Sequence, residues 1–241
     1  MSKIKKIAII GTGVIGAGWI IRCLAHDKIV YAFDKDLKLK KNLVSEIKRT
    51  WPHVKKLFNK KTIKLKNFKY FTSLEEAVKD ADFIQECASE NYALKTRLMT
   101  TIGKYAKPKA IISSSSSGLL PTKIYSKCRN PQRTIIGHPF NPVYLLPAVE
   151  IVPGKKTSKK YLDTAKKFYK SISMNPIMVK HELPGYLSDR LQEALWREGL
   201  HIINEGHATT EDLDRAIEDG PGLRWSLMGT FLTFHLAGGK A

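Results

Sequence analysis

The chain has 241 residues, 43% of them hydrophobic, which suits one large domain with a buried core or a domain with a smaller companion. Its three cysteines lie far apart and are odd in number, so we expect neither a metal site nor a disulfide framework, and a reduced, cytoplasmic protein. The start, MSKIKKIAIIGTG, is expected to be neither a signal peptide nor a membrane span, and no later apolar run has a spanning length.

The formal charge of +19 is concentrated in one segment. Between Lys35 and Tyr70 there are thirteen Lys and Arg residues against two acidic ones, a local net charge of +11. Clustered lysines can neutralise nucleic-acid phosphates, but this segment has no nucleic-acid-binding motif and no aromatic residues interleaved for base stacking. The charge therefore indicates a solvated helical face, and we expect no nucleic-acid or membrane partner.

Apolar runs with strand character alternate with helical patterns through the first three quarters of the chain. The runs predicted as strands are residues 4–10, 29–33, 68–71, 82–85, 109–112, 133–136, 149–152 and 176–179. The helices predicted between them are residues 14–25, 92–105 and one that begins at the capping-box spacing Ser73–Glu76. This alternation predicts an α/β fold of Rossmann type, a doubly wound and mostly parallel sheet.

Past residue 184 only helical patterns remain. Apolar residues recur at helical spacing over residues 187–195, a second helix is predicted to begin at Thr209, and a third to span residues 223–236. The third helix would carry an apolar stripe of Leu227, Phe231 and Phe234 that needs cover. We therefore expect a smaller all-helical domain, with a boundary near residue 182.

The sequence GTGVIG follows the first strand directly and opens the first helix, which is the context in which GxGxxG binds a dinucleotide. The predicted cofactor contacts in this turn are Gly11, Thr12, Gly13, Val14, Ile15 and Gly16. Glycines allow the tight turn, the approach of a pyrophosphate and close packing of helix on strand, while the helix N-terminus attracts the phosphates. Asp34 ends the second strand, where it would bind the adenosine ribose and repel a 2′-phosphate, so the predicted cofactor is NAD.

His138 follows an apolar strand in the block GHPFNP, and Glu150 lies twelve residues further on, within the next strand. Ligands of open α/β sheets bind in the crevice at the carboxyl ends of the strands. A carboxylate there would hold one tautomer of the imidazole and favour the imidazolium that forms when a histidine base takes a proton. Ser117 ends the strand before, so its hydroxyl could reach the same crevice.

Several motifs in order resemble the 3-hydroxyacyl-CoA dehydrogenase superfamily: IIGTGVIGAG, the serine run, GHPFNPV with Glu150 twelve residues on, and PGYLSDRL. The resemblance implies catalytic roles for His138, Glu150 and Ser117, and cofactor contacts at Glu90 and Lys95. It implies an NAD-binding domain over residues 1–181 and a helical domain over residues 182–241 that contributes substrate and homodimer contacts. It also implies that the serine run is a strand end and turn rather than a linker.

The tail ALWREGLHIINEG…GPGLRWSLMGTFLTFHLAGG is most similar to the branch of this superfamily that oxidises the 3-hydroxyl of L-carnitine, and a sister branch is the λ-crystallin type, which oxidises L-gulonate. Two departures from the superfamily stand out. Asp189 occupies a position where an Asn usually contacts the substrate, and the family continues with further helices after HLAGG, so the helical domain is expected to be partial.

The substrate therefore stays open between three possibilities. A quaternary ammonium is best met by aromatic faces, each giving about 0.5 to 2 kcal/mol, and the candidates are Tyr144 and Trp225, with Asp189 adding negative charge. L-gulonate or a 3-hydroxyacyl-CoA are alternatives, and the basic segment would suit the phosphates of CoA. An alternative of another class is a truncated, non-catalytic dinucleotide-binding protein.

Overall fold

The computed structural model describes residues 4–238, which divide between Leu187 and Ser188 into two compact units. We call residues 1–187 the Rossmann-type unit and residues 188–241 the helical unit. Each is described by itself.

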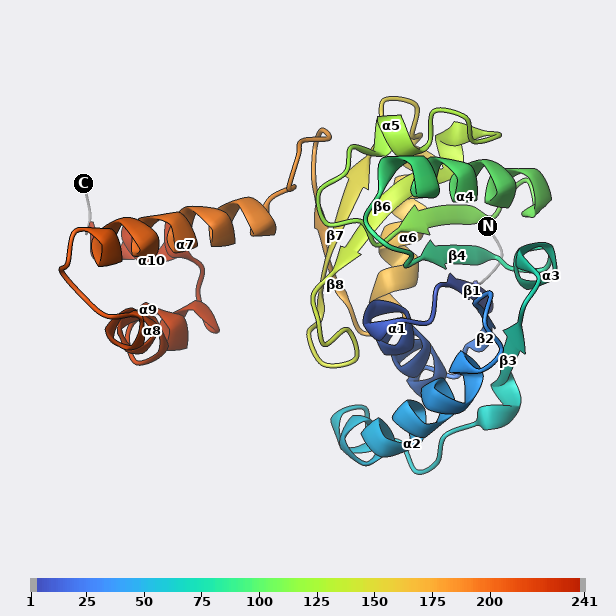
Figure 1. The fold of residues 1–241 in the computed structure, drawn as a ribbon, viewed down its shortest axis with the longest axis horizontal. Coiled ribbons are helices and arrows are strands. Elements are labelled where there is room, and N and C mark those ends of the chain that lie inside the picture. The colour runs from blue at the N-terminus through green and yellow to red at the C-terminus, as the bar shows by residue number, and fades with distance from the viewer. Residues whose placement is uncertain (1–3, 239–241) are drawn as a thin grey trace. The chain divides into compact units, whose positions relative to one another are not determined.

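The Rossmann-type unit is built on an eight-stranded sheet with the order β3-β2-β1-β4-β5-β6-β7-β8 (Figure 1). Its strands are β1 (Lys6–Ile10), β2 (Ile29–Phe33), β3 (Phe68–Phe71), β4 (Phe83–Glu86), β5 (Ile111–Ser114), β6 (Thr134–Pro139), β7 (Ala148–Pro153) and β8 (Asn175–Met178). β6 and β7 pair antiparallel, whereas the other neighbouring strands pair parallel. The predicted Rossmann-type, mostly parallel sheet is confirmed.

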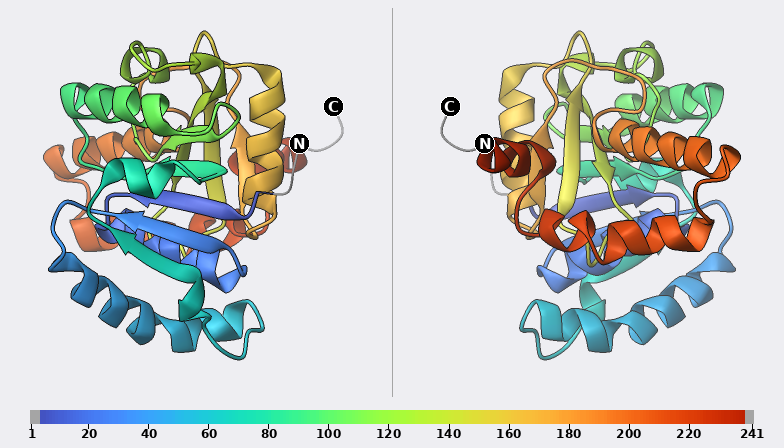
Figure 2. Two further views of the ribbon diagram at one scale, coloured as in Figure 1. Left: turned by 90° about the vertical axis from the view of Figure 1, so that its right-hand side faces the viewer. Right: turned by 90° about the vertical axis from the view of Figure 1, so that its left-hand side faces the viewer.

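Helices cover both faces of this sheet (Figure 2). The face that holds Ile7 and Ile9 packs against α1 (Val14–Ala25), α2 (Leu39–Leu57) and α6 (Lys159–Lys170). The face that holds Ala8 and Ile10 packs against α3 (Leu74–Val78), α4 (Tyr92–Tyr105) and α5 (Pro121–Ile124). Because successive strand residues point to opposite faces, the apolar run of β1 supplies both cores. Two short 3₁₀ turns, η1 (Leu65–Asn67) and η2 (Pro131–Arg133), complete the unit.

The basic segment forms the amphipathic helix α2 and the turn after it. Leu43, Ile47, Trp51 and Val54 are buried along one side of the helix. Lysines occupy the exposed side, among them Lys40, Lys41, Lys48 and Lys56. This arrangement is the solvated helical face that the charge pattern indicated.

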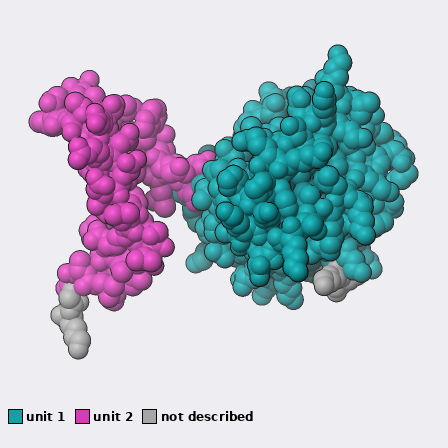
Figure 3. All heavy atoms as spheres, turned by 90° about the horizontal axis from the view of Figure 1, so that it is seen from below, with its two compact units in different colours: residues 1–187 teal, residues 188–241 magenta. Residues whose placement is uncertain are grey.

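The helical unit contains α7 (Ser188–Asn204), α8 (Thr210–Glu218), α9 (Pro221–Trp225) and α10 (Thr230–Ala237) (Figure 3). Thr209 caps α8 through a capping box with Asp212, so the predicted helix start at Thr209 is confirmed. The prediction of one helix over residues 223–236 is wrong. Gly229 adopts an extended conformation and begins α10 as a separate helix, which leaves Leu227 between the two helices instead of on a shared stripe.

No helix within residues 4–238 is both long and apolar enough to cross a membrane. In the same part of the chain, no group of three His, Cys, Asp or Glu side chains is arranged to hold a metal ion.

We predict that the helical unit self-associates. Leu227, Phe231 and Phe234 are 87%, 86% and 74% exposed, and burying a large apolar side chain is worth about 1.5 to 3 kcal/mol. Sedimentation velocity should detect a concentration-dependent dimer that the double change Phe231→Ser, Phe234→Ser weakens. Leu57→Ser, which removes an exposed leucine of the Rossmann-type unit, is the matched control. A monodisperse monomer at every concentration would contradict the prediction.

Candidate active site

The glycine turn after β1 has the shape that a dinucleotide phosphate needs. Gly11 has a φ of +98°, and its N–H donates to the carbonyl of Phe33 at 2.9 Å. A Cβ on Gly16 would lie 1.9 Å from the carbonyl oxygen of Gly11, whereas a Cβ on Gly13 would meet nothing within 4 Å. Packing therefore requires glycine at position 16, and the open space beside Gly13 lets a pyrophosphate approach the backbone.

Helix α1 begins directly after this turn and has no side-chain cap at its N-cap residue, Gly13. The first N–H groups of a helix lack partners within the helix and lie at the positive end of its dipole, so they bind anions. The turn also follows the strand at which the sheet order reverses, since β1 lies between β2 and β4. Open α/β sheets bind their ligands at that switch point.

Asp34, directly after β2, is held beside the glycine turn. Its Oδ2 accepts hydrogen bonds from the N–H and the hydroxyl of Thr12 at 3.0 and 2.9 Å, and its Oδ1 accepts from the N–H of Lys35 at 2.8 Å. A carboxylate has about four acceptor sites, so these bonds fix its orientation and leave capacity for the hydroxyls of a ribose.

His138 and Glu150 form a buried pair. The antiparallel register of β6 and β7 sets the two residues opposite each other, and His138 Nδ1 lies 2.8 Å from a carboxylate oxygen of Glu150. His138 is 6% exposed and Glu150 is fully buried. The other carboxylate oxygen accepts the N–H of Leu187 at 3.1 Å. With Nδ1 donating to the carboxylate, the neutral ring has Nε2 as its basic atom.

The serine run is a strand end followed by a hydrogen-bonded turn. β5 continues to Ser114, two residues further than predicted, because the side chains of this strand end find polar partners in the interior. Ser113 lies 3.0 Å from the hydroxyl of Tyr169, and Ser114 donates to Glu86 at 2.5 Å. These bonds satisfy the buried hydroxyls, so the start of the run is part of the sheet and its core rather than a linker.

Glu90 holds the turn that contains Ser117. Its carboxylate accepts the hydroxyl of Ser116 and the N–H groups of Ser117 and Gly118, the last two at 3.1 and 3.3 Å. The backbone around Ser117 is therefore fixed by a side chain from the loop after β4. This loop and this turn are the carboxyl ends of neighbouring strands.

Lys95 lies beneath the same loop. It is 1% exposed, and its Nζ donates to both oxygens of Glu86 at 2.9 and 3.0 Å and to the carbonyl of Ala88 at 2.9 Å. Glu90 lies 3.4 Å away. Glu86 was not predicted as part of the site. The feature that could have indicated it is a charged residue at the end of an apolar strand, where burial requires a partner. Contact of Glu90 and Lys95 with a cofactor stays a prediction.

A cleft of about 530 Å³ runs along α1 between the glycine turn, α2 and the loop after β6. Tyr144 lines it together with Gly13 and Val14. Asn141, within the GHPFNP block, also lines it, and its place in the sequence carries no signal beyond that block. The other predicted substrate residues belong to the helical unit: Asp189 lies in the first turn of α7 and Trp225 ends α9.

Comparison with known proteins places the chain in one family. Residues 6–182 match the profile of the 3-hydroxyacyl-CoA dehydrogenase NAD binding domain, and residues 185–241 match that of the 3-hydroxyacyl-CoA dehydrogenase C-terminal domain. The chain therefore belongs to the 3-hydroxyacyl-CoA dehydrogenase family. It is an NAD-dependent dehydrogenase, and the cofactor predicted from the glycine turn and Asp34 is confirmed.

Similar curated proteins include two L-carnitine dehydrogenases. That of Pseudomonas putida is 48% identical over 241 residues, which is 100% of this chain and 75% of the relative. That of Oceanobacillus iheyensis is 48% identical over 237 residues, 98% of this chain and 77% of the relative.

Solved structures resemble the chain at lower identity. An NAD⁺-dependent dismutase, 5-formyl-3-hydroxy-2-methylpyridine 4-carboxylic acid 5-dehydrogenase, is 26% identical with a TM-score of 0.90, covering 98% of this chain and 76% of the other. (S)-3-hydroxybutyryl-CoA dehydrogenase from Ralstonia eutropha is 26% identical with a TM-score of 0.83, covering 90% and 77%.

The two glycines of the turn should respond differently to alanine. Gly16→Ala should destabilise the unit by at least about 1 to 3 kcal/mol, since its methyl group would overlap the Gly11 carbonyl. Gly13→Ala should change the free energy of unfolding by only about 0.5 kcal/mol but weaken NAD binding, because its methyl group would occupy the space for the phosphates. Thermal unfolding and NAD titration measure both. Equal NAD affinity in wild type and Gly13→Ala would contradict this account of the turn.

Asp34→Ala should weaken NAD binding roughly tenfold or more, because a hydrogen bond to a charged group contributes about 1.5 to 3 kcal/mol. The preference for NAD over NADP should fall as well, since the charge that repels a 2′-phosphate is removed. Asp36→Ala, two residues along the same turn, is the control and should keep the preference. If the ratio of the two affinities were the same in Asp34→Ala and wild type, Asp34 would not be the ribose ligand.

Proposed function

We propose that this chain catalyses the NAD-dependent oxidation of the 3-hydroxyl of L-carnitine to 3-dehydrocarnitine. The observation that carries the proposal is the buried His138–Glu150 pair at 2.8 Å, which is the arrangement of an oriented general base. The choice of L-carnitine is supported by relatives named L-carnitine dehydrogenase that are 48% identical over the whole chain.

The residues that would hold the cofactor are the turn Gly11–Gly16 with the first N–H groups of α1, and Asp34 at the ribose. Glu90 and Lys95 fix the loop after β4 and the turn at Ser117, which face the same switch point. Bound there, NAD supplies the acceptor for the hydride that leaves C3 of the alcohol.

His138 acts as the general base. Nε2 takes the proton of the 3-hydroxyl while the C3 hydrogen leaves as hydride, so the alcohol becomes a ketone and the ring becomes an imidazolium. The carboxylate of Glu150 stabilises this new positive charge through the hydrogen bond to Nδ1. The N–H of Ser117 donates to the carboxylate of Glu90, which fixes the backbone there, and the hydroxyl of Ser117 positions the substrate oxygen.

Three side chains are proposed to recognise the trimethylammonium group. Tyr144 lines the cleft beside the glycine turn in the Rossmann-type unit, while Trp225 and Asp189 belong to the helical unit. Aromatic faces attract such a cation by about 0.5 to 2 kcal/mol each, and a carboxylate adds Coulomb attraction. Each contact is tested separately, as a rise in KM for L-carnitine with an unchanged KM for NAD.

The alternative substrate is a 3-hydroxyacyl-CoA. Helix α2 borders the cleft through Asn42, Glu46 and Arg49. The exposed lysines of the same helix form a cationic surface that suits the phosphates of CoA. Of the two, L-carnitine is favoured, because the relatives at 48% identity bear its name.

We also propose that the enzyme functions as a homodimer through its helical unit.

Initial rates of NADH formation with three alcohols test the substrate. L-carnitine, L-gulonate and a 3-hydroxyacyl-CoA are compared by kcat/KM, with NAD saturating. The proposal predicts the highest value for L-carnitine. A higher value for either of the others, or no turnover with L-carnitine, would contradict it.

Loss of the base should remove turnover and spare the cofactor. His138→Ala is expected to lower kcat about 100- to 10,000-fold, which is the usual contribution of a general base, with NAD affinity unchanged. Glu150→Gln should also lower kcat, because an amide stabilises the imidazolium less well than a carboxylate does. The factor should be smaller than for His138→Ala, because the base itself is still present. His181→Ala, at an exposed histidine of the same unit, is the control. Equal weakening of NAD binding by His138→Ala and Glu150→Gln would indicate a structural pair instead.

A further inference from the structure

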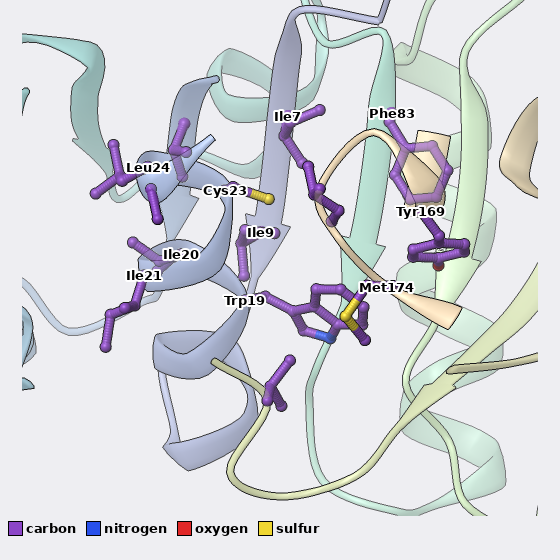
Figure 4. Packing of buried hydrophobic residues seen from close by; sticks show 14 of the residues in the cluster. Ile7, Ile9, Trp19, Ile20, Ile21, Cys23, Leu24, Phe83, Tyr169 and Met174 are labelled. Carbon is purple, nitrogen blue, oxygen red and sulfur yellow. The ribbon is translucent and has the colours of Figure 1, made fainter. Parts of the chain in front are cut away.

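A second polar cluster lies within the core of the Rossmann-type unit, on the α1 and α6 side of the sheet. We call it the Gln85 network. Trp19 comes from α1, Gln85 from β4 and Tyr169 from α6, while Ser113 lies in β5 and Ser115 directly follows it. Trp19, Gln85, Ser113 and Tyr169 are at most 1% exposed. Figure 4 shows Trp19 and Tyr169 among the apolar side chains of this core, with Phe83 beside Tyr169.

Gln85 uses both ends of its side-chain amide. Nε2 donates to the hydroxyl of Ser115 at 2.7 Å and to the carbonyl of Gly137 at 3.1 Å, while Oε1 accepts the hydroxyl of Tyr169 at 2.7 Å. Only this orientation of the amide pairs a donor with the Gly137 carbonyl, which is an acceptor alone. The network therefore has one direction, from Tyr169 through Gln85 to the backbone of β6.

The other members leave each hydroxyl with one donor role. The only hydroxyl hydrogen of Tyr169 is donated to Gln85, so the hydroxyl of Ser113, 3.0 Å away, donates to Tyr169. Burial raises the pKa of Tyr169, so its hydroxyl stays a protonated donor. Ser115 accepts a second bond, from the indole N–H of Trp19 at 3.1 Å. The network thus links α1, which carries the glycine turn, to the turn after β5 and to β6.

Gly137 fits this arrangement closely. A Cβ at this position would lie 1.8 Å from the hydroxyl oxygen of Tyr169 and 2.6 Å from that of Ser113. Glycine therefore lets the polar cluster pack directly against the strand residue that precedes His138. Replacing both partners of a buried hydrogen bond by apolar groups of the same shape can be nearly neutral for stability, whereas removing one partner alone destabilises. Stability alone therefore gives no reason for five polar members here.

We propose that Gln85 and Tyr169 are positioning residues for proton and hydride transfer, an inference that rests on the proposed function of His138. Gln85 bonds the Gly137 carbonyl and Tyr169 bonds Gln85, so together they fix the position of His138 relative to the Ser117 turn and to α1. The base and the cofactor-binding turn then stand in a fixed relation before the substrate arrives. A fixed relation of this kind matters because misplacement of reacting groups by about 1 Å can cost roughly 100-fold in rate.

The test compares variants of the 241-residue chain with wild type. Tyr169→Phe removes one hydroxyl, and Gln85→Met removes the amide at similar length. Each should lower kcat roughly tenfold, as expected when one hydrogen bond no longer supports the transition state, with the KM for NAD unchanged. The double variant should be about as slow as Gln85→Met alone, because residues that act through one chain of contacts are not additive.

Tyr125→Phe is the matched control. The hydroxyl of Tyr125 is buried and donates to the carbonyl of Ile135, two residues before Gly137 on the same strand. Its loss should lower the melting temperature to a similar extent but leave kcat unchanged. Where Tyr169→Phe is too unstable to measure, Gln85→Met carries the test, because it removes the bond to the Gly137 carbonyl and leaves Ser113 as a partner of the Tyr169 hydroxyl.

A second measurement needs no substrate. Nuclear magnetic resonance of ring-labelled histidines should show the His138 signals, assigned from His138→Ala, displaced in Tyr169→Phe and Gln85→Met but not in Tyr125→Phe. If the variants lost only stability, with kcat and the His138 signals as in wild type, the network would be structural. Failure of the proposed substrate is recognised separately, because wild type itself would then not oxidise L-carnitine, and the kcat comparison would use whichever alcohol it does oxidise.

Discussion

The antiparallel register of β6 and β7 is the constraint on which the proposed active site depends. It sets His138 opposite Glu150 within an otherwise parallel sheet. A fully buried carboxylate is tolerated only when its oxygens are hydrogen-bonded, and here they are bonded by the His138 ring and the N–H of Leu187. A shift of one residue along either strand would turn the two side chains to opposite faces. The pair is therefore as rigid as the sheet itself.

The rest of the site is brought to the same edge of the sheet by further polar contacts, one of them buried and two closer to the surface. Thr12 holds Asp34 at the end of β2, Glu86 holds Lys95 beneath the loop after β4, and Glu90 holds the turn at Ser117. The first and third join segments that follow neighbouring strands, and the second ties α4 to the end of β4, all at the edge where open α/β sheets bind ligands. The unit thus combines two apolar cores, which give stability, with a set of polar contacts at one edge, which give the proposed site its geometry.

The features that the sequence predicts are those with a local signal. The alternation of strands and helices, the glycine turn with Asp34, and the cap at Thr209 depend on residues near one another in the chain. What it missed depends on distant packing: the contact of Gln85 with Tyr169 spans 84 residues, and the extension of β5 into the serine run requires buried partners on α6 and β4. The break before α10 was missed because a single glycine within an apolar segment is a weak signal.

The most direct test of the account is a single turnover with L-carnitine that carries deuterium at C3. In the proposed mechanism, His138 removes the hydroxyl proton while the hydrogen on C3 leaves as hydride, for which NAD would be the acceptor. Mass spectrometry should therefore find one deuterium in the reduced nicotinamide cofactor for each molecule of ketone formed, and none released to water. Deuterium released to the solvent, together with a reduced cofactor that carries none, would contradict the proposed mechanism.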